Sequence, residues 1–182
     1  MHSRNISVGL LIALVSFTLS ARVAAQGTWA VENTFHIGGE GGMDYVTLDA
    51  KNHRLYVPRS THTMVIDADS GKVLADIPGQ KHNHGVALVP EAGRGFISDG
   101  EGAVVIFDLK TNAVLGTLKA RPDADGIIYD KASGLVLVVS GDDGVLMTLK
   151  PDVDPKTGSI DAPIDLGGKP EFLASDGACA VR

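Results

Sequence analysis

Short apolar runs separated by turn-forming residues cover the chain after its first 25 residues. Ala103–Phe107 and Leu135–Val139 are rich in β-branched side chains, and neighbouring segments alternate apolar with polar positions. Both patterns are typical of strands. The 22 glycines and 8 prolines interrupt the chain often enough to leave little room for long helices. The pattern therefore predicts an all-β fold.

One stretch of sequence recurs at a nearly constant spacing. The segment that starts at Asp44 is matched by segments starting at Gly85, Asp125 and Glu171, at offsets of 41, 40 and 46 residues. Self-similarity at such a period indicates a repeat architecture, in which each repeat is one supersecondary unit.

A second sequence motif recurs with nearly the same spacing as the first. An aspartate followed three residues later by Ser or Thr recurs at Asp67, Asp108 and Asp154, at offsets of 41 and 46 residues. This spacing of turn-forming residues predicts hairpin caps. Because both motif spacings lengthen in the same interval, we place an insertion of about six residues around Lys150–Val153.

Each repeat contains four short apolar segments. In the second repeat they are residues 85–89, 95–98, 103–108 and 113–119. A four-stranded unit of about 41 residues is one blade of a β-propeller, whereas a solenoid of β-meanders is the alternative. We expect blades near residues 43–79, 83–120 and 124–168, and the start of a further blade at 170–182.

The repeats resemble those of YVTN-type β-propellers, the YncE-like group of exported proteins. The resemblance spans about residues 40–178 and rests on Arg54–Arg59, on Val65–Leu74, on His84–Leu88 with the following Gly93–Phe96, and on Gly167–Phe172. Family members usually carry about seven blades. The resemblance therefore implies that this chain is the N-terminal part of a longer propeller.

The length predicts an incomplete ring of about three and a quarter blades. Four blades of 41 residues need more than the 157 residues that follow Ala25. Trp29–Ile37 resembles the outer strand of a preceding blade. Open blade edges favour self-association, and a short form that dimerises to close a ring is the alternative to a truncated chain.

The N-terminal segment has the organisation of a signal peptide. Arg4 precedes an uncharged run from Ile6 to Leu19, and small residues end at Ala25. We expect cleavage after Ala25, a propeller domain over residues 26–182, a periplasmic or secreted location and no membrane anchor after cleavage. An uncleaved N-terminal anchor is the alternative. The single cysteine, Cys179, excludes an internal disulfide.

Charge excludes two classes of partner. The chain has 16 basic and 22 acidic residues, a net charge of −6, and removal of residues 1–25 takes away two arginines and gives −8. Nucleic acids and anionic membranes attract clustered Lys and Arg. We therefore expect a protein or small-molecule partner and no nucleic acid.

The candidate binding residues come from the repeat alignment. Asp44, Asp125 and Glu171 occupy the first position of the inner strand, and His84 directly precedes the equivalent Gly85. Equivalent positions in a propeller lie on one rim of the central channel, where ligands bind. Carboxylates and an imidazole there would hold a cationic ligand or a metal, whereas hydrogen bonding of the acids to loops is the structural alternative.

A second, weaker metal candidate is the pair His82 and His84, whose side chains point to the same side if the strand alternates regularly. No fixed third ligand and no Gly-x-Ser-x-Gly motif accompany them. The sequence therefore favours a binding or scaffold module without a cofactor over an enzyme. The alternative is a metal-dependent or lactonase-like propeller, in which His84 acts as a base beside Asp125.

Overall fold

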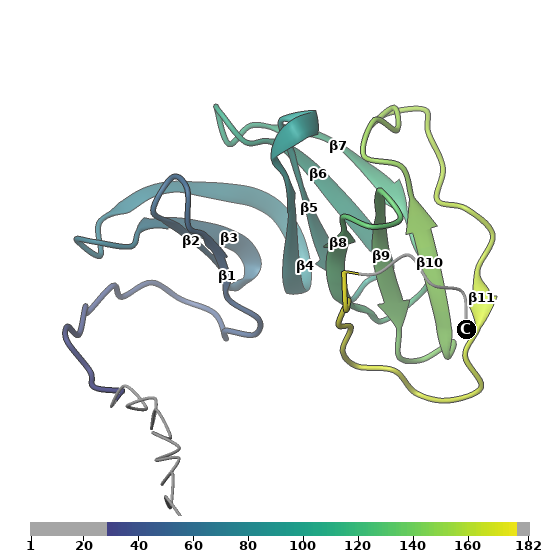
Figure 1. The fold of residues 1–182 in the computed structure, drawn as a ribbon, viewed down its shortest axis with the longest axis horizontal. Coiled ribbons are helices and arrows are strands. Elements are labelled where there is room, and N and C mark those ends of the chain that lie inside the picture. The colour runs from purple at the N-terminus through teal and green to yellow at the C-terminus, as the bar shows by residue number, and fades with distance from the viewer. Residues whose placement is uncertain (1–28, 178–182) are drawn as a thin grey trace, which may run out of the picture. The chain divides into compact units, whose positions relative to one another are not determined.

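The computed structural model describes residues 29–177. The predicted signal peptide, residues 1–25, and Cys179 lie outside this range. The chain divides into two units, residues 1–34 and 35–182. The described part of the first unit, residues 29–34, contains no helix or strand, and the fold below is that of the second unit (Figure 1).

The second unit is built almost entirely of antiparallel strands, as predicted. The strands are β1 (Thr47–Asp49), β2 (Arg54–Pro58), β3 (Ser60–Asp67), β4 (Val73–Val89), β5 (Arg94–Asp99), β6 (Ala103–Asp108), β7 (Val114–Lys119), β8 (Ala124–Asp130), β9 (Leu135–Ser140), β10 (Val145–Leu149) and β11 (Ile164–Asp165). A short 3-10 helix, η1 (Pro90–Ala92), joins β4 to β5. No helix within residues 29–177 is long and apolar enough to cross a membrane.

The strands form three four-stranded blades. Each strand pairs with its neighbour in sequence, in the orders β1 to β7 and β8 to β11. The first blade uses β1, β2, β3 and the first part of β4, the second uses the rest of β4 with β5, β6 and β7, and the third uses β8 to β11. The strands predicted for the second repeat agree with β5, β6 and β7 to within one residue.

The first two blades are joined by one unbroken strand, which the sequence did not predict. β4 runs for 17 residues from the outer edge of the first blade to the innermost position of the second (Figure 1). Asn83 belongs to both blades, because it pairs with Ser60 of β3 and with Asp99 of β5. The repeat boundary is therefore a bend within a strand, and both blades belong to one seven-stranded sheet.

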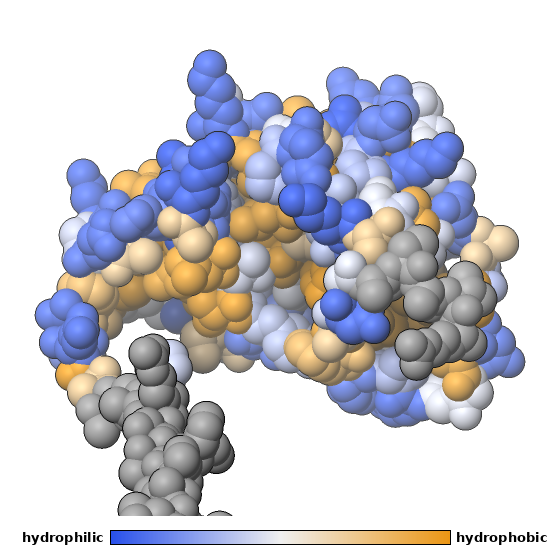
Figure 2. Space-filling view, viewed as in Figure 1, coloured by the Kyte–Doolittle hydropathy of each residue, from blue (hydrophilic) through white to orange (hydrophobic). Residues whose placement is uncertain are grey.

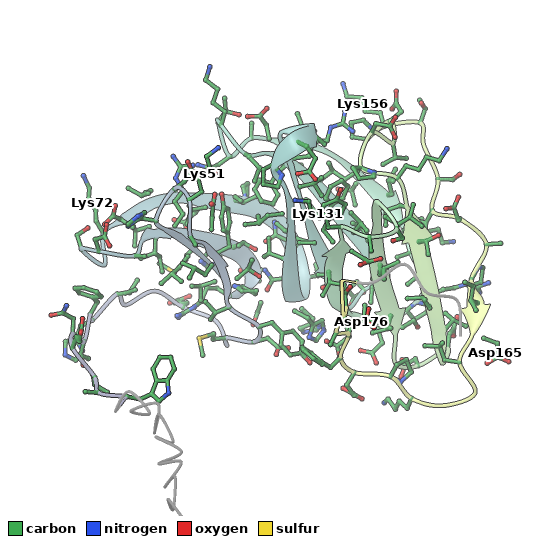
Figure 3. All side chains as sticks on the ribbon, in the orientation of Figure 1. Lys51, Lys72, Lys131, Lys156, Asp165 and Asp176 are labelled. Carbon is green, nitrogen blue, oxygen red and sulfur yellow. The ribbon has the colours of Figure 1, made fainter. Side chains whose placement is uncertain are left out.

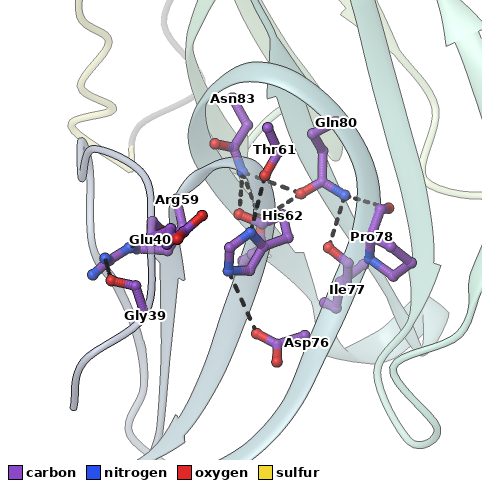
Figure 4. A network of polar contacts seen from close by, with 11 residues as sticks. Gly39, Glu40, Arg59, Thr61, His62, Asp76, Ile77, Pro78, Gln80 and Asn83 are labelled. Carbon is purple, nitrogen blue, oxygen red and sulfur yellow. Dashed lines mark hydrogen bonds and ion pairs between the residues drawn. The ribbon is translucent and has the colours of Figure 1, made fainter.

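A buried polar network fixes this bend (Figure 4). The Asn83 amide nitrogen donates to the His62 carbonyl at 2.9 Å, to Thr63 Oγ1 at 3.0 Å and to Gln80 Oε1 at 3.1 Å. The Gln80 amide nitrogen donates to the carbonyls of Ile77 and Pro78. Thr63, Gln80 and Asn83 are all buried. Apart from Asn83 Oδ1, which has no hydrogen-bond partner among the described residues, their side-chain polar atoms bond to protein groups in place of water.

Apolar side chains fill the spaces between neighbouring blades. The cluster between the first and second blades consists of Tyr56, Val65, Ile77, Val86, Ile97, Val105 and Phe107. A larger cluster joins the second and third blades and includes Phe96, Ile106, Leu118, Val136, Val138, Met147 and Leu149. Apolar side chains also gather over the first blade, between the hydrophilic turns (Figure 2). Face-to-face packing of this kind is how sheets bury their apolar faces.

The predicted hairpin caps are confirmed. Asp67 Oδ1 accepts bonds from the backbone nitrogen and hydroxyl of Ser70, and Asp108 Oδ1 accepts the same pair from Thr111. Asp154 Oδ1 accepts the backbone nitrogens of Lys156 and Thr157 at 2.8 Å. Lysines project outward at these turns, among them Lys72 and Lys156 (Figure 3).

The predicted insertion also lies where the spacing placed it. β10 ends at Leu149, and a turn closed by a bond from the Val153 nitrogen to the Lys150 carbonyl precedes the Asp154 cap.

Two expected strands do not form. Trp29–Ile37 and the start of the fourth repeat, residues 170–177, have no strand assignment. A strand needs a second strand to pair with, and neither segment pairs with a strand among the described residues. Ile37 instead packs against Val57, Met64 and Ile66 on the first blade.

Candidate functional site

Three of the four predicted rim residues meet at one end of the inner strands. One ligand atom from each of Asp44, His84 and Asp125 lies within 4.8 Å of the others. His84 Nδ1 is 2.8 Å from Asp44 Oδ2 and 3.6 Å from Asp125 Oδ1. These residues, hereafter the rim trio, are about 40 positions apart in sequence, so the repeat brings them together.

Backbone contacts between blades hold the trio in place. The Tyr45 nitrogen donates to the His84 carbonyl at 3.1 Å, which ties the residue after Asp44 to β4. The Gly85 nitrogen donates to Ser98 Oγ at 3.0 Å, which ties the residue after His84 to β5. Asp44 and His84 are thus each followed by a residue that a hydrogen bond anchors to another strand.

The imidazole of His84 has little free space. A Cβ atom on Gly100 would lie 3.0 Å from His84 Nε2, a separation tighter than ordinary packing allows. Glycine at position 100 therefore gives the ring the room that it needs beside Asp44.

Asp125 is the buried member of the trio. The residue is 5% exposed, and its Oδ1 makes no hydrogen bond to the described residues. Burial raises the pKa of its carboxyl to about 6, and the charges of Asp44 and Glu171, with a side-chain hydrogen bond to Glu171, act in the same direction. His84 opposes this increase. Burial and the neighbouring carboxylates thus disfavour the charged form of Asp125.

The fourth predicted rim residue, Glu171, lies beside Asp125 but outside the trio. Its backbone carbonyl accepts a hydrogen bond from the Tyr45 hydroxyl at 3.1 Å. Burial, together with the charges of Asp125, Asp44 and Glu171, raises the pKa of Tyr45. Tyr45 therefore stays protonated and donates across the mouth of the channel.

The segment that carries Glu171 lies directly against the third blade. A Cβ atom on Gly126 would lie 2.9 Å from the Glu171 carbonyl oxygen and 3.1 Å from Phe172 Cα. The rings of Tyr45 and Phe172 are 5.9 Å apart. The start of the fourth repeat thus bridges the third blade and the first, although it forms no strand.

A cavity of about 460 Å³ lies between the inner segments of the four repeats. Its walls are mostly apolar, and its lining residues are Tyr45, Val46, Thr47, Leu48, Gly85, Val86, Ala87, Leu88, Gly126, Ile127, Ile128, Tyr129, Phe172 and Leu173. Each rim position is followed by a residue that lines this cavity. The site therefore combines a charged rim with an apolar interior, the usual composition of a small-molecule site.

His82 lies apart from the trio. Its φ of 57° interrupts the regular alternation of β4, which the sequence argument had assumed. Its ring is exposed, and Nδ1 is 3.8 Å from Glu101 Oε1. His82 and His84 still border one hollow of about 180 Å³, but the described group with metal-ligand spacing contains His84 and not His82.

Sequence reasoning missed Tyr45 and Phe172. A signal for them existed, because both occupy the repeat position that directly follows the rim, as do Val86 and Gly126. Two aromatic residues and a glycine at one repeat position indicate side chains that face each other across a narrow space.

No protein-family model and no curated protein sequence matches the chain. Solved structures do match its fold. Hydrazine synthase of Kuenenia stuttgartiensis aligns over 82% of this chain and 44% of its own length, with a TM-score of 0.65 and 14% identity. The WD40 β-propeller domain of Doa1 aligns over 70% of this chain and 42% of its own, with a TM-score of 0.57 and 15% identity.

Two further solved structures also match the fold of this chain. BamB of Moraxella catarrhalis aligns over 72% of this chain and 37% of its own length, with a TM-score of 0.57 and 17% identity. The computationally designed Ika4 protein aligns over 76% of this chain and 82% of its own, with a TM-score of 0.61 and 15% identity. The chain thus spans less than half the length of hydrazine synthase, BamB and the Doa1 domain. With its three antiparallel blades, it has a β-propeller fold with an incomplete ring of four-stranded blades.

Proposed function

We propose that this protein is an exported binding propeller of the YncE-like type, which holds a small ligand at the mouth of its central channel. The observation that carries this proposal is the position of the rim trio above the apolar cavity of about 460 Å³. Charged groups at the mouth would orient the ligand, and the apolar walls would bind its body. Partner proteins are the second class of occupant, through the loops at the same end of the blades.

Methyl NMR tests whether the cavity binds small molecules. In a screen of organic fragments against the purified protein, we expect the shifted methyl signals to include those of Val86 and Ile127, which line the cavity. Leu48→Trp fills the cavity and should abolish the shifts. Leu74→Trp is the matched control, because Leu74 is a similarly exposed leucine on the outer part of β4. Shifts that survive Leu48→Trp would contradict the proposal.

Export has a separate test. The organisation of residues 1–25 predicts that the mature protein begins at Gln26. N-terminal sequencing of the protein from the periplasm or medium of an expressing Gram-negative host should give this residue. A protein that keeps Met1 and fractionates with membranes or cytoplasm would contradict the proposed export.

A hydrolase is the second candidate, and the His84–Asp44 pair favours it. An imidazole held by a carboxylate at 2.8 Å is the arrangement of a general base and its orienting group. Asp44 is the nearer carboxylate, and that of Asp125 lies 3.6 Å from the same ring nitrogen. Turnover of a lactone or ester panel that His84→Gln abolishes, with folding intact, would support an enzyme. Equal rates for the two proteins would exclude it.

A further inference from the structure

We propose that the rim trio of Asp44, His84 and Asp125 binds a divalent transition-metal ion, with Zn²⁺ as its representative. This inference rests on the proposed function, because it names the class of ligand that the channel mouth holds.

The spacing of the three ligand atoms suits such an ion. Zn²⁺ binds nitrogen and oxygen at roughly 2.0 Å, which places tetrahedral ligands about 3.3 Å from one another. The separations of 2.8 Å and 3.6 Å from His84 Nδ1 to the two carboxylates lie on either side of this value. All three ligand atoms lie within 4.8 Å of one another, so side-chain rotations would bring them into coordination with one ion.

The donor types narrow the choice of ion. One imidazole nitrogen and two carboxylates suit Zn²⁺ and its first-row neighbours, whereas Ca²⁺ and Mg²⁺ prefer oxygen alone. The ion would bind His84 through Nδ1, the ring nitrogen that faces Asp44. Three protein ligands leave a fourth position open toward a ligand in the channel.

Asp125 provides an independent indication that the site takes a ligand. Its Oδ1 is buried, makes no hydrogen bond to a described residue and lies 3.6 Å from His84 Nδ1. A buried carboxylate oxygen that accepts no hydrogen bond is energetically costly. A bound cation would satisfy it and would also reduce the repulsion between Asp125 and Asp44.

The protein also offers a matched comparison. His53 Nδ1 lies 2.8 Å from Asp69 Oδ2, the same separation as in the His84–Asp44 pair. The His53 pair is exposed and belongs to no group of three ligand residues within residues 29–177. A metal ion that needs a third ligand should therefore not bind to the His53–Asp69 pair.

The test is a Zn²⁺ titration of the full chain in metal-free buffer against a chromophoric chelator. We expect one ion per chain, and binding at least tenfold weaker in His84→Gln and in Asp44→Asn. His53→Gln and His82→Gln should change the affinity less than twofold. Asp44 is partly exposed, so Asp44→Asn remains informative if His84→Gln fails to fold. Circular dichroism checks the folding of every variant.

Two results would overturn the inference. One is wild-type protein that takes up no Zn²⁺, and the other is binding that persists in a folded His84→Gln or Asp44→Asn variant. The fragment screen uses no metal, so the two proposals fail separately. Fragment binding without Zn²⁺ uptake would refute the metal site and support the binding cavity. Zn²⁺ uptake without fragment binding would support the metal site and refute the binding cavity.

Discussion

Burial of Asp125 beside two other acids has an energetic cost that His84 only partly offsets. Its pKa of about 6 exceeds the ordinary value of 3.8, so the ionised form is less favourable in the folded protein than in the unfolded chain. Well below pH 3.8 the carboxyl is neutral in both states. Wild-type protein should therefore lose stability as the pH rises from about 4 to 6.

Replacement of Asp125 by asparagine should remove this cost. At pH 7.5, Asp125→Asn should be more stable than the wild type by up to about 3 kcal/mol, the free-energy equivalent of the raised pKa. Urea unfolding at pH 7.5 and pH 3.5 measures the difference, which should disappear at the lower pH. The exposed Asp142→Asn is the control. A pH-independent effect of Asp125→Asn would argue against a buried, ionised carboxylate.

The capping aspartates have the opposite pH dependence. Hydrogen bonds lower the pKa of Asp67, Asp108 and Asp154, and bonds from Ser133 and Ser175 lower that of Asp130 to about 2. Their contribution to the stability of the fold is complete above the unfolded-state pKa of 3.8. It is lost as the pH falls through their pKa values in the folded protein.

We therefore expect the melting temperature to fall between about pH 4 and pH 2. In Asp108→Asn the decrease should be smaller than in the wild type, because one capping carboxylate is missing. Calorimetry across this range measures both slopes. Identical slopes would show that the Asp108 cap contributes nothing in solution.

At the scale of elements, stability of the first two blades depends on the bend in β4. Asn83→Ala removes three donated hydrogen bonds and leaves the buried acceptor oxygens of Thr63 and Gln80 with fewer partners. The expected loss in the free energy of unfolding is about 2 kcal/mol. Asn52→Ala is the control, because Asn52 is an exposed turn residue, and should cost less than about 0.5 kcal/mol. Equal effects in urea unfolding would contradict a structural role for the network.

The strands themselves were largely predictable, because each depends on local patterns that recur in every repeat. The bend at Asn83 was not predictable, because a glycine- and histidine-rich segment of this kind is equally compatible with a loop. Its strand pairing arises from tertiary contacts of Asn83 with Ser60 and Asp99. The expected strands at 29–37 and after Pro170 did not form for the converse reason: their local pattern was suitable, but no strand within residues 29–177 pairs with them.

At the scale of the whole propeller, the repeat explains why the site exists. Residues at one repeat position of a propeller share one rim, so the sequence could place Asp44, His84 and Asp125 together without any structure. It could not show that Asp125 is the buried member or that Asp44 is the nearest partner of His84. Those features depend on local packing, in which Gly100 leaves room beside the His84 ring and Gly126 lets the backbone of Glu171 approach the third blade.

Convergence of all four repeats on one channel mouth is the central claim, and a NOESY spectrum of the aromatic protons tests it most directly. The ring centroids of Tyr45 and Phe172 are 5.9 Å apart, although the residues belong to the first and fourth repeats. Tyr56 and Phe107 lie 5.7 Å apart in the core and provide an internal reference. We predict cross-peaks for both pairs. Cross-peaks for Tyr56 and Phe107 without any for Tyr45 and Phe172 would contradict a mouth built from all four repeats.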